Sequence, residues 1–225
     1  MNCGHKVVLH SYGRPEDTPQ GVEFFDANRL MKESEIVRFS TGSLALASDI
    51  YRYRILKEGL GIYADCDMYC MKPIVDTPYI LGWEEQFTVN GAILKVPSDS
   101  EMMKSLLAAA EDPYFIPPWL KKSRVFKSRI RKYIGFPRPV SKQQWGTIGP
   151  LLISHVVRDL GLEAKVSPID VFYPLHHTQT SLLHERGLAL RDIVTPRTAA
   201  IHFYNTANKN TNIMPDTPLY EIINS

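Results

Sequence analysis

The chain has few cysteines, no long apolar run and almost no net charge, and each absence excludes a class of protein. Its 225 residues include only three cysteines, too few for a disulfide framework, so we expect a reducing compartment. No apolar run approaches the length that spans a bilayer, and the first residues show no signal-peptide pattern. The formal net charge of +2 argues against nucleic acid as a partner.

Several common functional motifs are absent as well. The sequence contains no Walker phosphate loop, no GxGxxG after a predicted strand and no GxSxG nucleophile elbow. His176, His177 and His184 match no standard zinc spacing, and no cysteine lies near them. The residues that are present must therefore indicate a different chemistry.

The composition is ordinary for a globular protein, with 44% hydrophobic and 22% charged residues. The length is sufficient for a sizeable core, and we expect one domain over residues 1–225. Local patterns predict strands at 6–10, 22–25, 62–64, 79–83, 87–96 and 199–203, a helical turn at 26–32, and helices at 44–59, 98–111 and 150–159.

The most informative stretch is residues 47–73, which begins within the helix expected over 44–59. Ser43 is the expected N-cap of that helix, and Gly59 and Gly61 supply its end. Its apolar stripe is expected to consist of Ala47, Ile50, Tyr51, the stem of Arg54, and Ile55.

Two aspartates, Asp65 and Asp67, follow the short apolar strand at 62–64. Alternate residues of a strand face the same way, so both carboxylates can share one face. They repel each other there unless a cation lies between them. Oxygen ligands suit Mn²⁺ or Mg²⁺, which often complete their shell with substrate phosphates. A solvated acidic turn is the alternative, and Cys66 is expected to be a small buried filler rather than a ligand.

Two motifs carry a resemblance to a known family. The first combines the SD-x-x-RY of residues 48–53, the GIY-x-D-x-D of residues 61–67, and Lys72-Pro73. The second combines GHKVVLHSY at 4–12 with GVE at 21–23 and Asp26-Ala27. Together they resemble the DxD-containing sugar transferases of glycosyltransferase family 32, the group of yeast and bacterial capsular polysaccharide enzymes, and more distantly the clostridial glucosylating toxins.

The resemblance implies an α/β, GT-A-like nucleotide-diphospho-sugar transferase fold, with a mixed, mostly parallel sheet flanked by helices. Relatives have a strand and a helix before the GH motif, so we expect this chain to lack the usual first strand. The implied activity is metal-dependent, retaining transfer of a hexose from a nucleotide-diphosphate sugar. The expected donor is a UDP-sugar, the acceptor is a saccharide or a lipid-linked molecule, and the cofactor is Mn²⁺ or Mg²⁺.

The resemblance also implies roles for individual residues. The implied metal ligands are Asp67, Asp65 and His202. The implied catalytic residues are Asp65, Asp67 and Arg52, and the implied donor-binding residues are Asp49, Tyr63, Asn90, Asp65 and His202. In relatives a Trp follows the final strand, whereas this chain has Asn205, Thr206 and Asn208 there.

Each of these roles has a plain structural alternative. Asp49 and Arg52 share a helix face and can form a surface ion pair of little energetic value. Tyr63 can be a core aromatic, and His202 can be a histidine at the edge of the core. Asn90 and Gly91 indicate either a hairpin turn or a strand that a ligand approaches closely.

The second informative stretch is a basic helical insertion over about 118–142. Nine basic residues occur there without an acidic one, and apolar residues can form one helix face. Such a helix suits an anionic membrane surface or a lipid-linked phosphate acceptor through residues 120–142, which predicts a cytoplasmic protein peripheral at the inner membrane face. A solvated charged insertion is the alternative.

Two other functions remain open on the sequence alone. A degenerate, non-catalytic binder of nucleotide sugars or carbohydrates would explain the missing first strand and the altered tail. A metal-dependent phosphatase fits the aspartate pair but not the SD-x-x-RY helix.

Overall fold

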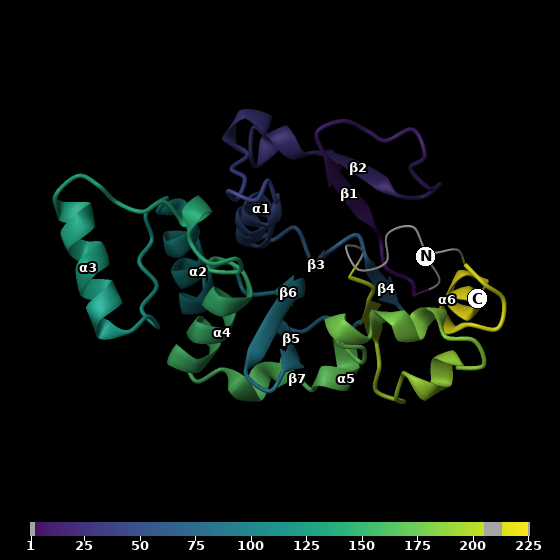
Figure 1. Cartoon of the computed structure of the whole chain (residues 1–225). Coiled ribbons are helices and arrows are strands. Elements are labelled where there is room, and N and C mark those ends of the chain that lie inside the picture. The colour runs from purple at the N-terminus through teal and green to yellow at the C-terminus, as the bar shows by residue number, and fades with distance from the viewer. Residues whose placement is uncertain (1–2, 205–212, 225) are drawn as a thin grey trace.

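The computed structural model describes residues 3–204 and 213–224, and its helices and strands form a mixed α/β arrangement (Figure 1). The strands belong to three sheets. The first sheet pairs β1 with β2, the second has the order β3-β6-β5-β7, and the third pairs β4 with β8. Their bounds are β1 Val8–Ser11, β2 Glu23–Asp26, β3 Tyr63–Ala64, β4 Met68–Cys70, β5 Ile80–Glu85, β6 Thr88–Lys95, β7 Val166–Ser167 and β8 Ala200–His202.

The strand pairing differs from the expected mostly parallel sheet. Among the described residues, β1–β2 and β5–β7 are parallel, whereas β3–β6, β4–β8 and β5–β6 are antiparallel. For β5 and β6 the reason is local, because a tight hairpin joins them and a hairpin can only join antiparallel strands.

The helices have the bounds α1 Ala45–Lys57, α2 Glu101–Glu111, α3 Lys122–Tyr133, α4 Pro150–Asp159, α5 Ile169–Phe172 and α6 Pro218–Ile223. Three of them contact the largest sheet: α4 packs against β6, α5 against β5 and α1 against β3. Short 3₁₀ turns lie at η1 Ala27–Arg29, η2 Glu33–Glu35, η3 Val140–Lys142, η4 Glu163–Lys165, η5 His177–His184 and η6 Leu190–Asp192. In the described part of the chain, no helix is long and apolar enough to cross a membrane.

Helix α1 lies where the sequence predicted it, but its buried face is different. Ile50, Tyr51 and Arg54 are only partly buried, while Tyr53 and Leu56 are almost completely buried. The expected stripe is right only in part: Ala47 and Ile55 are buried. It misses Tyr53 and Leu56 because α1 packs them against α2 and also buries a polar pair on a second side. A helix that is covered on two sides has no single apolar period.

The ends of α1 largely follow the expected signals. The hydroxyl of Ser43 accepts a hydrogen bond from the amide of Ala45 at 3.2 Å, although the N-cap position itself is Leu44. Gly59 and Gly61 have φ values of +64° and +111°, which only glycine adopts without strain, and they turn the chain toward β3.

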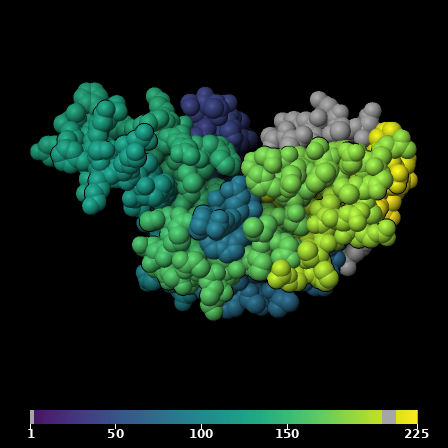
Figure 2. All heavy atoms as spheres, turned by 60° about the horizontal axis from the view of Figure 1, so that its bottom comes forward, coloured from purple at the N-terminus to yellow at the C-terminus, as the bar shows by residue number. Residues whose placement is uncertain are grey.

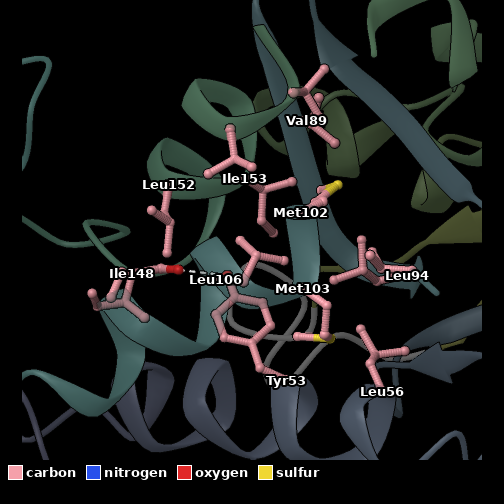
Figure 3. Close-up of a cluster of buried hydrophobic side chains, with 14 of the residues drawn as sticks. Tyr53, Leu56, Val89, Leu94, Met102, Met103, Leu106, Ile148, Leu152 and Ile153 are labelled. Carbon is pink, nitrogen blue, oxygen red and sulfur yellow. Dashed lines mark hydrogen bonds between the residues drawn. The ribbon is translucent and has the colours of Figure 1, made fainter. Parts of the chain in front are cut away.

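The main core lies between α1, α2, α4 and β6 (Figure 3). Tyr53 is completely buried there, and its hydroxyl donates a hydrogen bond to the carbonyl of Ile148 at 2.5 Å. This bond connects α1 to the segment that leads into α4, and so fixes the position of α1 relative to the start of α4.

Replacing Tyr53 by Phe removes that hydroxyl and leaves the buried carbonyl of Ile148 without its donor. We expect the free energy of unfolding to fall by about 1–2 kcal/mol, measured by urea denaturation. Tyr133→Phe is the matched control, since Tyr133 is 92% exposed. Equal stability of the two variants would contradict the importance of this bond.

Candidate metal and donor site

The aspartate pair lies in a turn between β3 and β4, not in a strand as expected. The amide of Met68 donates to the carbonyl of Asp65 at 3.0 Å and closes the turn. The amide of Asp65 donates to Ala92 of β6 at 2.7 Å, and the carbonyl of Asp67 accepts from Phe203 at 2.9 Å. The turn is therefore held on one side by β6 and on the other by the end of β8. Cys66, at its tip, is exposed, so the expectation of a buried filler is wrong.

The turn and β8 bring Asp65, Asp67 and His202 together. One potential ligand atom from each residue lies within 4.8 Å of the others. His202 reaches this position because β8 pairs with β4, which places His202 opposite Met68. All three side chains are at least partly buried, with exposed fractions of 26%, 16% and 9%, so a freely solvated acidic turn is excluded.

The polar atoms of this cluster fit a divalent cation. Nε2 of His202 lies 3.2 Å from Oδ1 of Asp67, and its buried Nδ1 has no hydrogen-bond partner among the described residues. Two carboxylates and one imidazole suit Mn²⁺, which accepts both oxygen and nitrogen, whereas Mg²⁺ prefers oxygen alone. Three protein ligands leave coordination positions for phosphate oxygens and water.

A buried arginine lies directly behind the turn. Arg52 is 3.4 Å from Asp65 through Nη2 and 3.5 Å from Asp49 through Nη1, and Nη2 also donates to Ser48 at 3.3 Å. Asp49 and Arg52 have side-chain exposed fractions of only 6% and 8%. The alternative of a surface ion pair is therefore wrong, and α1 holds a guanidinium shared between two carboxylates.

Burial governs the charges of this group. It raises the pKa of Asp49 to about 6, although the nearby Arg52 opposes the shift. Burial alone would lower the pKa of Arg52, but Tyr63, Asp49 and Asp65 outweigh that effect and raise it. The guanidinium thus stays charged and contributes a fixed positive charge beside Asp65.

Two glycines make room for this buried pair. A Cβ at Gly91 would collide with the guanidinium of Arg52 and lie 3.1 Å from Cδ1 of Ile153. A Cβ at Gly149, at the start of α4, would lie 2.6 Å from a carboxylate oxygen of Asp49. Gly91 lies inside β6, so the hairpin-turn alternative is wrong, and the close approach that the sequence suggested is made by Arg52.

Tyr63 and Asn90 flank the turn on β3 and β6. The hydroxyl of Tyr63 donates to Oδ1 of Asp65 and lies 3.3 Å from Oγ of Ser48, while its ring lies 4.8 Å from the Arg52 guanidinium carbon. The side-chain oxygen of Asn90 accepts from the amide of Ala92, whose carbonyl binds the Asp65 amide. Tyr63 thus contacts the predicted metal ligand Asp65 directly, whereas Asn90 is connected to Asp65 only through Ala92.

Sequence reasoning missed a neighbouring cluster. The hydroxyl of Tyr204 donates to Glu84 at 2.9 Å, and its ring lies 3.9 Å from that of His202. Beyond it, one potential ligand atom each of Glu85, His176 and His177 lies within 4.8 Å of the others, while His184 is not part of that group. Spacing did not reveal this arrangement, because the carboxylate comes from the distant β5. The tail residues Asn205, Thr206 and Asn208 lie outside the described residues.

A comparison with known families supports the interpretation of this site. Residues 15–88 match the family model described as the glycosyltransferase sugar-binding region containing a DXD motif. The match includes α1 and the Asp65–Asp67 turn, whereas Asn90 and His202 lie outside it. No curated protein and no solved structure matches the chain significantly. The match supports a glycosyltransferase family, while the finer resemblance to family 32 and to the toxins stays a prediction.

Proposed function

We propose that this protein is a metal-dependent glycosyltransferase of the family 32 type, transferring a hexose from a nucleotide-diphosphate sugar with retention of configuration. The observation that carries the proposal is the convergence of Asp65, Asp67 and His202 beside the buried Arg52. This arrangement offers a cation site and a fixed positive charge at one point, as a departing diphosphate requires.

The residues of the site have distinct roles in this proposal. Asp67, Asp65 and His202 would hold Mn²⁺, or Mg²⁺ as the alternative. When bound, the ion neutralises negative charge on the leaving diphosphate. Tyr63 fixes the orientation of Asp65 through its hydroxyl, and Arg52 limits the repulsion between that carboxylate and the phosphates.

Binding of the donor, expected to be a UDP-sugar, would use the surfaces next to the turn. Asp49, Tyr63 and Asn90 are the proposed contacts to the nucleotide or the transferred sugar. In a retaining transfer the acceptor hydroxyl attacks the face from which the diphosphate leaves. The described residues do not single out a catalytic base for this step.

The acceptor is proposed to be a saccharide or a lipid-linked molecule. Helix α3 and its flanking residues carry the basic charges expected for contact with an anionic membrane, which would place the protein in the cytoplasm, peripheral at the inner membrane face. The nearly balanced net charge gives no support to nucleic acid as a partner.

Removal of divalent metal provides the direct test. We expect chelation with EDTA to abolish hydrolysis or transfer of a donor drawn from a panel of UDP-, GDP- and CMP-sugars, and Mn²⁺ to restore it, because carboxylates cannot bind a diphosphate without a cation between them. Nucleotide release measures turnover. Activity that survives chelation would contradict the proposal. Tight donor binding without turnover of any donor would favour the non-catalytic binder.

A further inference from the structure

Helix α3 projects from the rest of the protein (Figure 2), and none of its residues is buried. We call residues 118–142 the arm. Between the arm and the body lies a cavity of about 390 Å³, lined by aromatic residues such as Trp119 and by cations. The cations that line it are Arg124, Lys127, Arg131, Lys132 and Arg138.

Four of the five cations that line this cavity have no ion pair with a carboxylate among the described residues. No acidic residue is among the described residues that line it. Within the described part of the chain, Lys132 is the only one of these cations with an ion pair, to Asp112 at 2.8 Å. All five cations are exposed. A phosphate bound among them would relieve their mutual repulsion through charge-assisted hydrogen bonds.

The amphipathic character of α3 is inverted. Arg124, Lys127 and Arg131 follow helical spacing on the face toward the cavity. Phe126, Ile130 and Tyr133 follow the same spacing on the opposite face and are 66%, 43% and 92% exposed. A helix at the surface of a globular protein normally turns its apolar side inward, so an apolar face directed at solvent marks an interaction surface.

We propose that the arm docks on a lipid bilayer, with its apolar outer face in the interface and the phosphate of an anionic lipid in the cavity. Among the candidate partners, only an anionic amphiphile can both neutralise the cations of the cavity and cover the exposed apolar face of α3. A second copy of the arm would add like charge, and a nucleic acid would leave the apolar face uncovered. The inference deepens the proposed function, because a lipid-linked acceptor carries the same phosphate, but binding itself does not depend on catalysis.

Sedimentation with phosphatidylcholine vesicles, with and without phosphatidylglycerol, tests the proposal in the absence of donor and metal. We expect the wild-type chain to bind only the anionic vesicles. Arg124→Gln/Lys127→Gln/Arg131→Gln should weaken binding by about 100-fold, because each basic side chain near an anionic surface contributes about fivefold. Phe126→Ser/Tyr133→Ser should weaken binding at least about tenfold through lost apolar insertion.

Matched control variants distinguish a specific effect of the arm from a general effect of surface charge or surface hydrophobicity. Lys165→Gln/Arg186→Gln/Arg191→Gln removes the same charge from exposed positions elsewhere, and Val75→Ser/Phe87→Ser removes exposed apolar side chains. Both should bind vesicles nearly as the wild type does. Equal loss in a control and its arm variant would overturn the proposal.

The remaining outcomes are decided by soluble phosphate. Inorganic pyrophosphate that binds the wild type but not the cavity variant, with no vesicle binding, would overturn the lipid occupant in favour of a free phosphate. Absence of binding to any anionic vesicle would also overturn the proposal. Vesicle binding by a protein that turns over no donor would support docking of the arm on the bilayer and would contradict the proposed transferase function.

Discussion

Asp67→Asn should lower metal-dependent donor turnover by on the order of 10³-fold while leaving the fold intact. The amide keeps the shape of the carboxylate and can still accept a hydrogen bond from Nε2 of His202, which lies 3.2 Å away. It loses the negative charge that a divalent cation requires. Nucleotide release at saturating donor, measured over a range of Mn²⁺ concentrations, checks the result.

The matched control for this variant is Asp99→Asn, which neutralises an exposed aspartate ahead of α2. It should turn over donor as the wild type does. Full activity of Asp67→Asn at ordinary Mn²⁺ concentrations would contradict the proposal that Asp67 binds the catalytic cation. Loss of activity together with loss of the cooperative unfolding transition would point to a structural role instead.

Gly91→Ala should lower turnover by about 100-fold, because its methyl group occupies the space of the Arg52 guanidinium. Arg52 cannot withdraw without leaving both Asp49 and Asp65. The added methyl group would also lie 3.1 Å from Cδ1 of Ile153. The free energy of unfolding should fall by about 1–3 kcal/mol from overpacking. Kinetics and urea denaturation measure the two effects separately.

Gly13→Ala is the control for this second variant. Gly13 has no neighbour within 4 Å of an added Cβ and no positive φ, so the substitution should change neither activity nor stability appreciably. Wild-type turnover in Gly91→Ala would show that the position of Arg52 does not matter for the reaction. The proposed electrostatic role of Arg52 would then be wrong.

Elements with a clear local signal could be predicted from the sequence. The helices at α1, α2 and α4 and the strands β5 and β6 were expected from periodicity, caps and prolines, and they occur close to the predicted bounds. The match to a DXD-containing family also agrees with the resemblance of the SD-x-x-RY and aspartate motifs. These signals are local because they depend on residues within one or two turns of each other.

Features that depend on distant contacts could not be predicted. The burial of Asp49 and Arg52 depends on Gly91 and Gly149, which lie on other elements. The grouping of His176 and His177 with Glu85 needs the fold to bring two segments together. The expectation of a single domain over residues 1–225 and the individual roles of the site residues stay predictions, because local sequence patterns do not determine them.

The hydrogen-bonded contact between Asp67 and His202 joins positions that are 135 residues apart. An ion held by both side chains would act as a removable cross-link, closing a long loop of chain much as a disulfide does. His202, one of these two residues, lies beyond residue 88, where the family match ends. Binding of the ion would therefore further stabilise the packing of the last third of the chain against the aspartate turn, which the pairing of β8 with β4 already holds in place.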